Sequence, residues 1–278
     1  MNRTMVTATN TMSQLQLKMN LIGNNIANAD TTGYKSKQGT FNELLVQQFN
    51  NQPQNNQEIG RLTSLGVHGG TGARLGLIKV MLKQGSLKNT GRDLDIALQK
   101  EDLFFKIDVN GETHFTRDGS LYLSPSTQAA NQVHLVTSNG HYVLDENDEP
   151  IVITGDVHSI QFNEHGTLEV QDDTGLVQEV NVGVVSVHNA QYLEQKGGNL
   201  IGLSPLYLEQ GINEADIFTN LTGDLRTGIS LQQRALESSN VDISKEMTDL
   251  INVQRQYQFQ ARSITMADQM LGLINSVR

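Results

Sequence analysis

A seven-residue repeat of apolar side chains runs through residues 4–29. Its first position is held by Met5, Met12, Met19 and Ile26, and the position three residues later by Ala8, Leu15, Ile22 and Ala29. Such spacing predicts a helix with a narrow apolar stripe that packs against another helix, as in a coiled coil. The intervening positions are rich in Thr, Asn and Ser, which are weak helix formers. We therefore expect this helix to need a partner along its stripe.

A similar repeat lies near the other end of the chain. Its main position is held by Leu250, Tyr257, Ile264 and Leu271, and the position three residues before each of these by Met247, Gln254, Ala261 and Asp268. Asp242 or Ser244 can cap the start of a helix, so the predicted helix spans about 243–276. More than 30 residues at 1.5 Å each make a helix of roughly 50 Å, a length typical of a coiled coil.

Between about 95 and 215 the pattern changes to short runs in which apolar and polar residues alternate, as in half-buried strands. The pairs Asn110-Gly111, Asp118-Gly119 and Asn139-Gly140 separate such runs, and each pair predicts a hairpin turn. The predicted fold class is mixed but mainly β: an all-β, hairpin-rich central domain with N- and C-terminal coiled-coil-forming helices.

A polar and glycine-rich segment separates the first helix from the β domain. Nine of the eleven residues from 47 to 57 are Asn or Gln, and glycines are frequent from 60 to 76. This composition cannot form a hydrophobic core by itself, so we expect an extended or loop-rich segment. The predicted organisation is an N-terminal helix and motif for assembly and export, an extended segment, an acidic β domain and a C-terminal assembly helix, at 1–35, 36–92, 93–217 and 218–278.

Composition and charge exclude several classes of function. The chain has no Cys, which rules out disulfides, thiolate nucleophiles and iron–sulfur clusters. Residues 93–217 carry four Lys or Arg and 21 Asp or Glu, a net charge of −17, which argues against a nucleic-acid partner. We expect no transmembrane segment, because no apolar run reaches 18 residues. The N-terminal residues lack the apolar stretch of a cleaved secretory signal.

Candidate catalytic and metal-binding groups are sparse. None of the seven His stands in a metal-binding spacing. Asp93 and Asp95 would share one face of a strand, but the sequence supplies no second catalytic group beside them. We predict no catalytic, cofactor-binding or metal-binding residues, no cofactor, and a protein that is not an enzyme.

Three groups of motifs resemble one known family. Residues 24–35, NNIANADTTGYK, closely resemble the N-terminal signature of flagellar rod and hook proteins. Residues 235–242, ALESSNVD, resemble the C-terminal signature together with the later Glu246-Met247, Leu250-Ile251 and Gln254-Arg255-Gln256-Tyr257. Between them, other short runs match the part of the family sequence that leads into the β domain. They are Gln84–Leu87, Thr90-Gly91, Leu94–Leu98, Phe104-Phe105 and Phe115–Gly119. The resemblance covers essentially the whole chain.

The resemblance implies a structural subunit of the bacterial flagellum, located in the basal body within the cell envelope. Such subunits leave the cell through the flagellar type III export apparatus, and their terminal helices pack into a hollow axial tube. The implied partners are further copies of the chain, other rod and hook subunits and the export apparatus. The assembly interface we predict consists of Met5, Met12, Leu15, Met19, Ile22, Ile26, Asn28, Thr31, Gly33, Tyr34, Lys35, Glu237, Asn240, Asp242, Met247, Leu250, Gln254, Arg255, Tyr257, Ile264 and Leu271.

Several of these residues have more specific expected roles. Asn28, Thr31 and Gly33 should end the first helix, because Asn and Gly tolerate left-handed backbone and Thr bonds local amides. The apolar heptad residues should pack between subunits, the alternative being packing within one subunit. Lys35 and Arg255 are expected to pair with carboxylates of other subunits or to remain solvated.

The position of the subunit in the axial structure is less constrained. The resemblance favours the distal rod, in which a polar insertion follows the first helix, as Phe49 to Gly66 does here. A proximal rod or hook-type subunit and a secreted surface-binding module without catalytic activity are the alternatives. A cell-wall hydrolase would need an added catalytic domain, for which the chain has no spare length. Two departures from the family pattern are Lys100–Leu103, in place of a glycine-containing turn, and Gln233-Arg234, in place of Gln-Gly.

Overall fold

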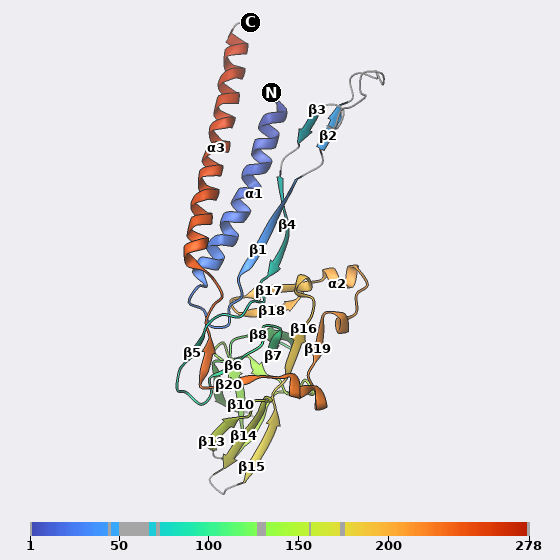
Figure 1. The fold of residues 1–278 in the computed structure, drawn as a ribbon, viewed down its shortest axis with the longest axis vertical. Coiled ribbons are helices and arrows are strands. Elements are labelled where there is room, and N and C mark those ends of the chain that lie inside the picture. Colours follow the sequence, from blue (N-terminus) through green and yellow to red (C-terminus); the bar gives the residue numbers. More distant parts are fainter. Residues whose placement is uncertain are drawn as a thin grey trace, which may run out of the picture. The chain divides into compact units, whose positions relative to one another are not determined.

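The computed structural model describes residues 2–43, 46–49, 67–70, 73–126, 132–155, 157–172 and 176–276 (Figure 1). The chain divides into two compact units. Unit 1 comprises Met1–Asn24, Gly39–Ile78 and Ser244–Arg278, and unit 2 comprises Asn25–Gln38 and Lys79–Ile243. Unit 2 therefore contains the end of the N-terminal motif as well as the central β structure.

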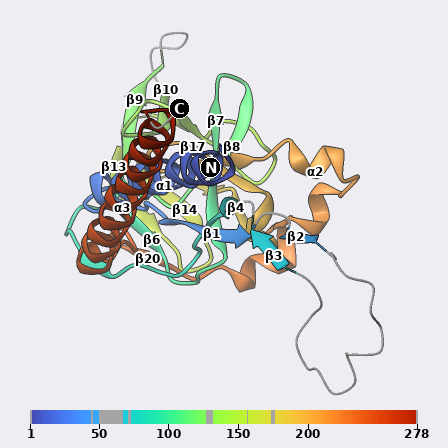
Figure 2. The same cartoon turned by 90° about the horizontal axis from the view of Figure 1, so that it is seen from above.

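Two long helices dominate unit 1. They are α1 (Asn2–Ala27) and α3 (Ile243–Ser276), which lie side by side and run in opposite directions (Figures 1 and 2). The predicted C-terminal helix of 243–276 is confirmed with its bounds. Within the described part of the chain, no helix is both long and apolar enough to span a membrane.

The segment after α1 contributes extended strands to unit 1. β1 (Lys37–Glu43) pairs with β4 (Ala73–Val80), and β2 (Val46–Phe49) pairs antiparallel with β3 (Val67–Gly70). Much of the described part of the segment expected to be extended thus forms strands, whereas 81–86 and 90–92 do not. Residues 44–45, 50–66 and 71–72 lie outside the described residues, and with them most of the Asn- and Gln-rich run.

Unit 2 is built on one large antiparallel sheet. Its strands are β7 (Leu103–Val109), β8 (Glu112–Thr116), β9 (Leu121–Pro125), β10 (Gln132–Thr137), β11 (Tyr142–Val143), β12 (Val152–Thr154), β16 (Val184–Val187), β17 (Leu193–Gly197), β18 (Leu200–Leu203) and β19 (Phe218–Asn220). The strand order is β12-β10-β11-β7-β8-β18-β17, with β9 on β10, β16 on β7 and β19 on β16. Short helical turns are α2 (Leu206–Glu209), η2 (Ala190–Tyr192), η3 (Glu214–Asp216) and η4 (Gly223–Gly228).

Two of the three predicted hairpin turns are confirmed. Asn110 and Gly111 have φ values of 57° and 87° and join β7 to its partner β8, as the right-handed twist of a hairpin favours. The Asn139-Gly140 turn joins β10 to β11, with Gly140 at φ 82°.

The third predicted turn, Asp118-Gly119, is wrong as a hairpin. It separates β8 from β9, but β9 pairs with β10. The Asp118 carboxylate instead accepts hydrogen bonds from the backbone N–H and the hydroxyl of Ser120. Gly119 lies against the carbonyl of Ile96, where a Cβ atom would collide with it. A long-range backbone contact therefore replaces the local turn.

Smaller sheets complete unit 2. β13 (Val157–Phe162), β14 (Thr167–Asp172) and β15 (Val177–Asn181) form a three-stranded antiparallel sheet. β5 (Leu87–Asn89) pairs with β21 (Ala235–Glu237), and β6 (Ile96–Leu98) pairs with β20 (Leu231–Gln233). Because these partners lie beyond residue 217, the compact β unit is wider than the domain of 93–217 expected from the sequence.

The core of unit 2 lies on both faces of β7. Phe104 and Phe105 are adjacent on this strand, so their side chains point to opposite faces. Phe105 belongs to a large apolar cluster that reaches β10, β13 and β14. Phe104 belongs to a smaller cluster with Val80, Phe115 and Ile201. This double-sided packing holds the end of β8, and the residues that follow it, in a fixed position.

Candidate assembly site

The N-terminal motif folds back on itself after α1. The buried Asn25 side chain donates to the Lys37 carbonyl at 2.9 Å and accepts from the Lys37 N–H at 3.0 Å and from the Tyr34 hydroxyl at 3.2 Å. Tyr34 itself is 1% exposed. The asparagine amide therefore fixes the loop between helix and strand through one donor group and one acceptor group.

Three residues expected to end the first helix lie in this loop. The helix ends at Ala27, and the Thr31 hydroxyl donates to the Asn28 side chain at 3.3 Å. Gly33 has φ 66°, a conformation that glycine adopts without steric cost. A Cβ atom on Gly33 would also collide with the backbone of Arg117 and Asp118. Glycine is thus needed both for its backbone conformation and for close approach.

A buried ionic cluster joins this loop to distant parts of the chain. The Lys35 ammonium lies 2.8 Å from Glu237 Oε1, and Arg117 Nη2 lies 2.6 Å from Glu237 Oε2. The three side chains are between 0% and 1% exposed. We call Lys35, Arg117 and Glu237 the Glu237 clasp. It connects the N-terminal motif, the residues after β8 and the end of β21.

Backbone groups complete the hydrogen bonding of the clasp. Lys35 also donates to the carbonyls of Leu82 and Lys83, at 3.1 and 2.9 Å. Arg117 donates to backbone carbonyls at 2.5 Å, 2.6 Å and 3.3 Å, namely those of Lys100, Leu103 and Leu98. The Gly85 N–H donates to Glu237 Oε1 at 2.8 Å. Buried charges need such complete bonding to be tolerated.

The clasp holds two positive groups and one carboxylate, and this imbalance affects the Lys35 ammonium. Burial, followed by the charge of Arg117, lowers the pKa of Lys35 from 10.5 to about 8, while Glu237 acts in the opposite direction. Burial also lowers the pKa of Arg117, again opposed by Glu237. Glu237 is therefore the group on which the stability of both cations depends.

Asn240 makes a second connection between the terminal motifs. Its side-chain amide donates to the carbonyls of Met81 and Lys83, at 2.9 and 2.8 Å, and its Oδ1 accepts from the Ser36 N–H at 2.7 Å. Asn240 thereby ties the C-terminal motif to the N-terminal loop immediately before α3 begins. Asp118 makes a separate connection between that loop and the β structure, because it accepts from Thr32 at 3.1 Å and from Asn199 at 2.7 Å.

The structure corrects the expected role of Lys35. We expected an ion pair between subunits or a solvated charge, but Lys35 is buried and pairs with Glu237 of its own chain. The reason is the fold of unit 2, which brings residues 202 positions apart into contact. Arg117 and Asp118 were recognised only as part of a motif. The one signal for Arg117 was its place in that motif, directly after the β8 strand.

The heptad residues divide by exposure. Leu15 and Ile22 are buried by other residues of the same chain, so these two side chains pack within one subunit. Met5, Met12, Met19 and Ile26 are half-buried, as are Leu250, Tyr257, Ile264 and Leu271. On α3 the fully buried residues are Val253 and Ala267. Other predicted contacts remain exposed, namely Asp242, Met247, Gln254 and Arg255.

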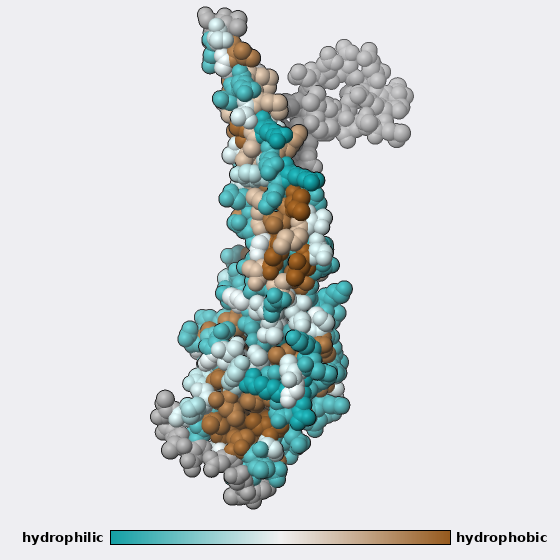
Figure 3. Space-filling model, turned by 90° about the vertical axis from the view of Figure 1, so that its left-hand side faces the viewer, coloured by the Kyte–Doolittle hydropathy of each residue, from teal (hydrophilic) through white to brown (hydrophobic). Residues whose placement is uncertain are grey.

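A second apolar stripe runs along the outer side of α3. Ile251 is 49% exposed, Phe259 67%, Met266 53% and Leu273 67%. At 100° per residue these positions lie on the side of the helix opposite Val253 and Ala267. Figure 3 shows brown apolar side chains along the helical part of the molecule. α3 thus carries two apolar faces, of which its own chain covers one.

The described residues hold no group of three or more His, Asp or Glu side chains placed to bind a metal ion. The two carboxylates considered for acid–base chemistry lie in separate ion pairs, Asp93 with Arg234 and Asp95 with Arg92. These ion pairs therefore join segments of the chain to one another.

Comparisons with known proteins identify the family. Residues 5–35 match the family described as flagella basal body rod protein, 101–170 the flagellar hook protein FlgE/F/G D1 domain, and 232–277 the flagellar basal body rod FlgEFG protein C-terminal region. The flagellar hook-basal body complex protein FlhP of Bacillus subtilis (strain 168) is 45% identical, covering 100% of both chains. The chain belongs to the flagellar rod and hook protein family.

Two further members of the rod and hook family extend this result. The flagellar basal-body rod protein FlgG of Bacillus subtilis (strain 168) is 33% identical and covers 100% of both chains. FlgG of Caulobacter vibrioides is 32% identical, with 98% of each chain covered. The protein is accordingly a structural component of the flagellar basal body. Each of the three matched regions supplies one member of the Glu237 clasp, Lys35, Arg117 and Glu237 respectively.

Proposed function

We propose that this chain is a distal rod subunit that assembles with copies of itself through its terminal helices, after export by the flagellar type III apparatus. Membership of the rod and hook family implies association with other rod and hook subunits. The observation that carries the self-assembly proposal is the exposed apolar stripe of α3. A helix that is apolar on two faces needs a partner on each.

The size of the exposed stripe supports a stable contact between subunits. Covering one large apolar side chain contributes about 1.5–3 kcal/mol, and Phe259 and Leu273 are both 67% exposed. Arg255 and Arg262 lie on the same side of α3 and are exposed, so they can pair with carboxylates at the edge of such a contact. The proposed intersubunit contacts therefore include Met247, Gln254 and Arg255.

The remaining predicted interface residues take two proposed roles. Half-buried heptad residues complete the contact from the inner side, namely Met5, Met12, Met19, Ile26, Leu250, Tyr257, Ile264 and Leu271. Tyr34, Lys35, Glu237 and Asn240 act as positioning residues, because they fix the loop and the motif from which α1 and α3 depart. Folding of the clasp would then present the two helices for assembly.

The distal position and the export route rest on the family resemblance. In the distal rod type a polar insertion follows the first helix, and Phe49 to Gly66 has that composition. Relatives named flagellar basal-body rod protein FlgG, which match over 98–100% of the chain, support a place in the rod. Type III export is proposed on family membership alone.

Electron microscopy of basal bodies from a strain that lacks the gene tests this function. A distal rod subunit predicts a rod that stops short and carries no hook. A shorter stub would indicate a proximal subunit. A complete rod and hook would contradict the proposal and would favour an accessory secreted module.

A matched pair of variants tests the role of the α3 stripe. Leu273→Asp places a charge on the exposed stripe and should abolish assembly while the β structure remains folded. Leu208→Asp is the control, because Leu208 in α2 is 69% exposed and Leu273 is 67% exposed. Complementation of the deletion strain with each variant should restore rods only for Leu208→Asp. Equal restoration by both variants would argue against helix-mediated assembly.

A further inference from the structure

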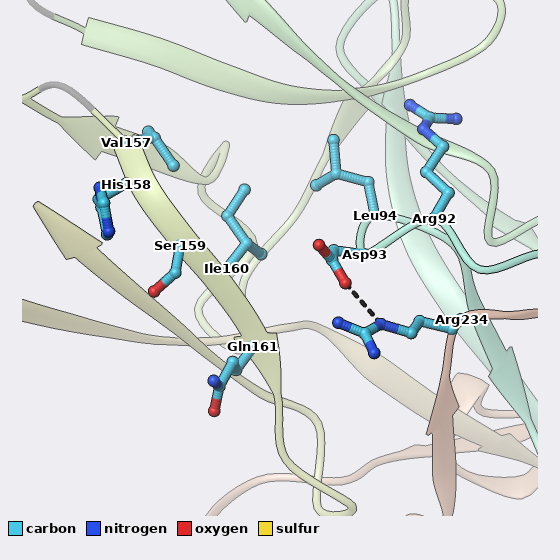
Figure 4. Close-up of a pocket in the computed structure, with 9 residues that line it drawn as sticks. All are labelled: Arg92, Asp93, Leu94, Val157, His158, Ser159, Ile160, Gln161 and Arg234. Carbon is cyan, nitrogen blue, oxygen red and sulfur yellow. Dashed lines mark hydrogen bonds and ion pairs between the residues drawn. The ribbon is translucent and has the colours of Figure 1, made fainter.

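A groove opens on the surface of unit 2 between β13 and the residues before β6. It has a volume of about 380 Å³, and its apolar lining consists of Leu94, Val157 and Ile160. Figure 4 shows Ile160 and Leu94 between the two walls, with Asp93 and Arg234 joined across one end. Figure 3 shows an apolar area low on the β part of the molecule, on the side where β13 lies in Figure 1.

β13 borders the groove as an edge strand. In the described residues it pairs with β14 along one edge only. At its other edge the Ile160 carbonyl accepts a hydrogen bond from the Gln233 side chain at 3.1 Å. Edge strands with apolar neighbours are surfaces to which further chain segments add.

Arg234 at the mouth of the groove is conformationally unusual. It has φ 60°, a left-handed conformation that is unfavourable for a residue with a Cβ atom. Its side chain is 63% exposed and pairs with Asp93, which is 51% exposed. Such an exposed ion pair contributes little to stability. Stability alone therefore does not account for an arginine here, and its charge at the groove needs a separate reason.

The complementary surface lies on the other edge of the same three-stranded sheet. Leu176, directly before β15, is 73% exposed and Val177 is 57% exposed. Glu179 is also exposed and lies on the same face as Val177, because strand side chains alternate. Val177 on this edge is complementary to the apolar lining of the groove. The Glu179 carboxylate beside it is complementary to the Arg234 guanidinium beside that lining.

We propose that β15 of one copy docks into the β13 groove of the next copy, with Val177 against the apolar lining and Glu179 beside Arg234. The inference rests on the proposed self-assembly and names one of its contacts. With a net charge of −17 over residues 93–217, neighbouring β units repel unless a cation meets a carboxylate. A contact between two different surfaces propagates into a ring or helical array, as a tube requires.

Disulfide trapping in the full-length chain tests this contact, because the chain has no Cys. Arg234→Cys and Glu179→Cys are made in separate chains with different tags, which are mixed, assembled and oxidised mildly. The contact predicts a mixed disulfide several-fold more abundant than either homodisulfide. Leu208→Cys replaces Glu179→Cys in the control mixture and should give only background. A mixed product at that background in assembled material would overturn the inference.

Charge exchange provides a second measurement, in which position 234 stays charged but the sign of the charge is reversed. Arg234→Glu alone and Glu179→Arg alone should each weaken assembly, and mixing the two chains should restore it. Loss without restoration, or no loss in either variant, contradicts the pairing. Failure of the unsubstituted chain to assemble would contradict the proposed function itself. Normal assembly of that chain with background cross-linking would remove only the groove contact.

Discussion

The Glu237 carboxylate lies 2.8 Å from the Lys35 ammonium, although 202 positions separate the two residues in the sequence. Its other oxygen lies 2.6 Å from Arg117 Nη2. One buried side chain therefore connects the two terminal motifs with the β structure. α1 ends shortly before Lys35, and α3 begins six residues after Glu237.

Replacing Glu237 with Gln should strongly destabilise unit 2. The substitution keeps the size of the side chain but leaves Lys35 and Arg117 as two buried cations without a carboxylate. Breaking a buried ion pair from one side costs about 3–5 kcal/mol. Urea unfolding followed by circular dichroism measures the loss.

The control for this substitution is Asp93→Asn, which removes the exposed partner of Arg234. An exposed pair contributes less than about 1 kcal/mol, so this variant should unfold close to the wild type. If Glu237→Gln proved as mild as Asp93→Asn, the clasp would not be a main source of stability.

Lys35 should make stability depend on pH in the alkaline range. Its pKa in the folded chain is about 8, lowered from 10.5 first by burial and then by the charge of Arg117. Below pH 8 the ammonium is charged in both folded and unfolded chains, and the cost of burying that charge is fully present. Between pH 8 and 10.5 the folded chain binds fewer protons, so this group makes the free energy of unfolding rise with pH.

Urea unfolding of the wild type and of Lys35→Met isolates this contribution. The stability of the wild type relative to the variant should rise by up to about 3 kcal/mol between pH 8 and 10.5. Below pH 8 the difference should stay constant. The lowered pKa would be refuted by a difference that is the same at every pH.

Gly33 and Gly23 should respond in opposite directions to replacement by Ala. Gly33 has φ 66°, and a Cβ atom there meets the backbone of Arg117 and Asp118, so Gly33→Ala should cost at least about 2 kcal/mol. Gly23 lies within α1, where a Cβ atom meets no heavy atom within 4 Å. Gly23→Ala should therefore stabilise the helix by up to about 1 kcal/mol.

Thermal unfolding of the two variants measures both effects with one chemical change. A Gly33→Ala variant as stable as the wild type would mean that the close approach of the Gly33 loop to the β structure does not form. In that case a stabilising effect of Gly23→Ala would still show that residue 23 is helical.

Local patterns in the sequence were enough to predict the elements that depend on neighbouring residues. The heptad repeat and the cap residues predicted the bounds of α3, and Asn110-Gly111 predicted a hairpin because both residues accept positive φ. Asp118-Gly119 carries the same signal but was wrong, because Gly119 serves a close contact with Ile96 from a distant segment. Turn chemistry alone cannot distinguish these two uses of glycine.

The clasp could not be predicted from the sequence for a related reason. Lys35 and Arg117 look like solvated charges until the fold removes them from water, and each lies more than 100 positions from Glu237. The helix α3 presents a similar ambiguity, because apolar residues lie on both of its sides. Periodicity identifies the stripe through Leu250 and Leu271 but does not reveal that the chain covers Val253 and leaves Phe259 exposed.

Arg234 offers a prediction in which the family pattern and the backbone agree. The motif resemblance predicts glycine at this position, and Arg234 has φ 60°. Arg234→Gly should remove the conformational cost while losing only an exposed ion pair with Asp93. Arg234→Ala loses the same pair and keeps the cost, so the glycine variant should be more stable than the alanine variant by about 1 kcal/mol.

Urea unfolding of both variants beside the wild type measures this difference. If Arg234→Gly is at least as stable as the wild type, the arginine is not retained for folding, and its charge is available for a contact outside the chain. If Arg234→Gly is instead less stable than Arg234→Ala, the left-handed backbone at this position is not a source of strain.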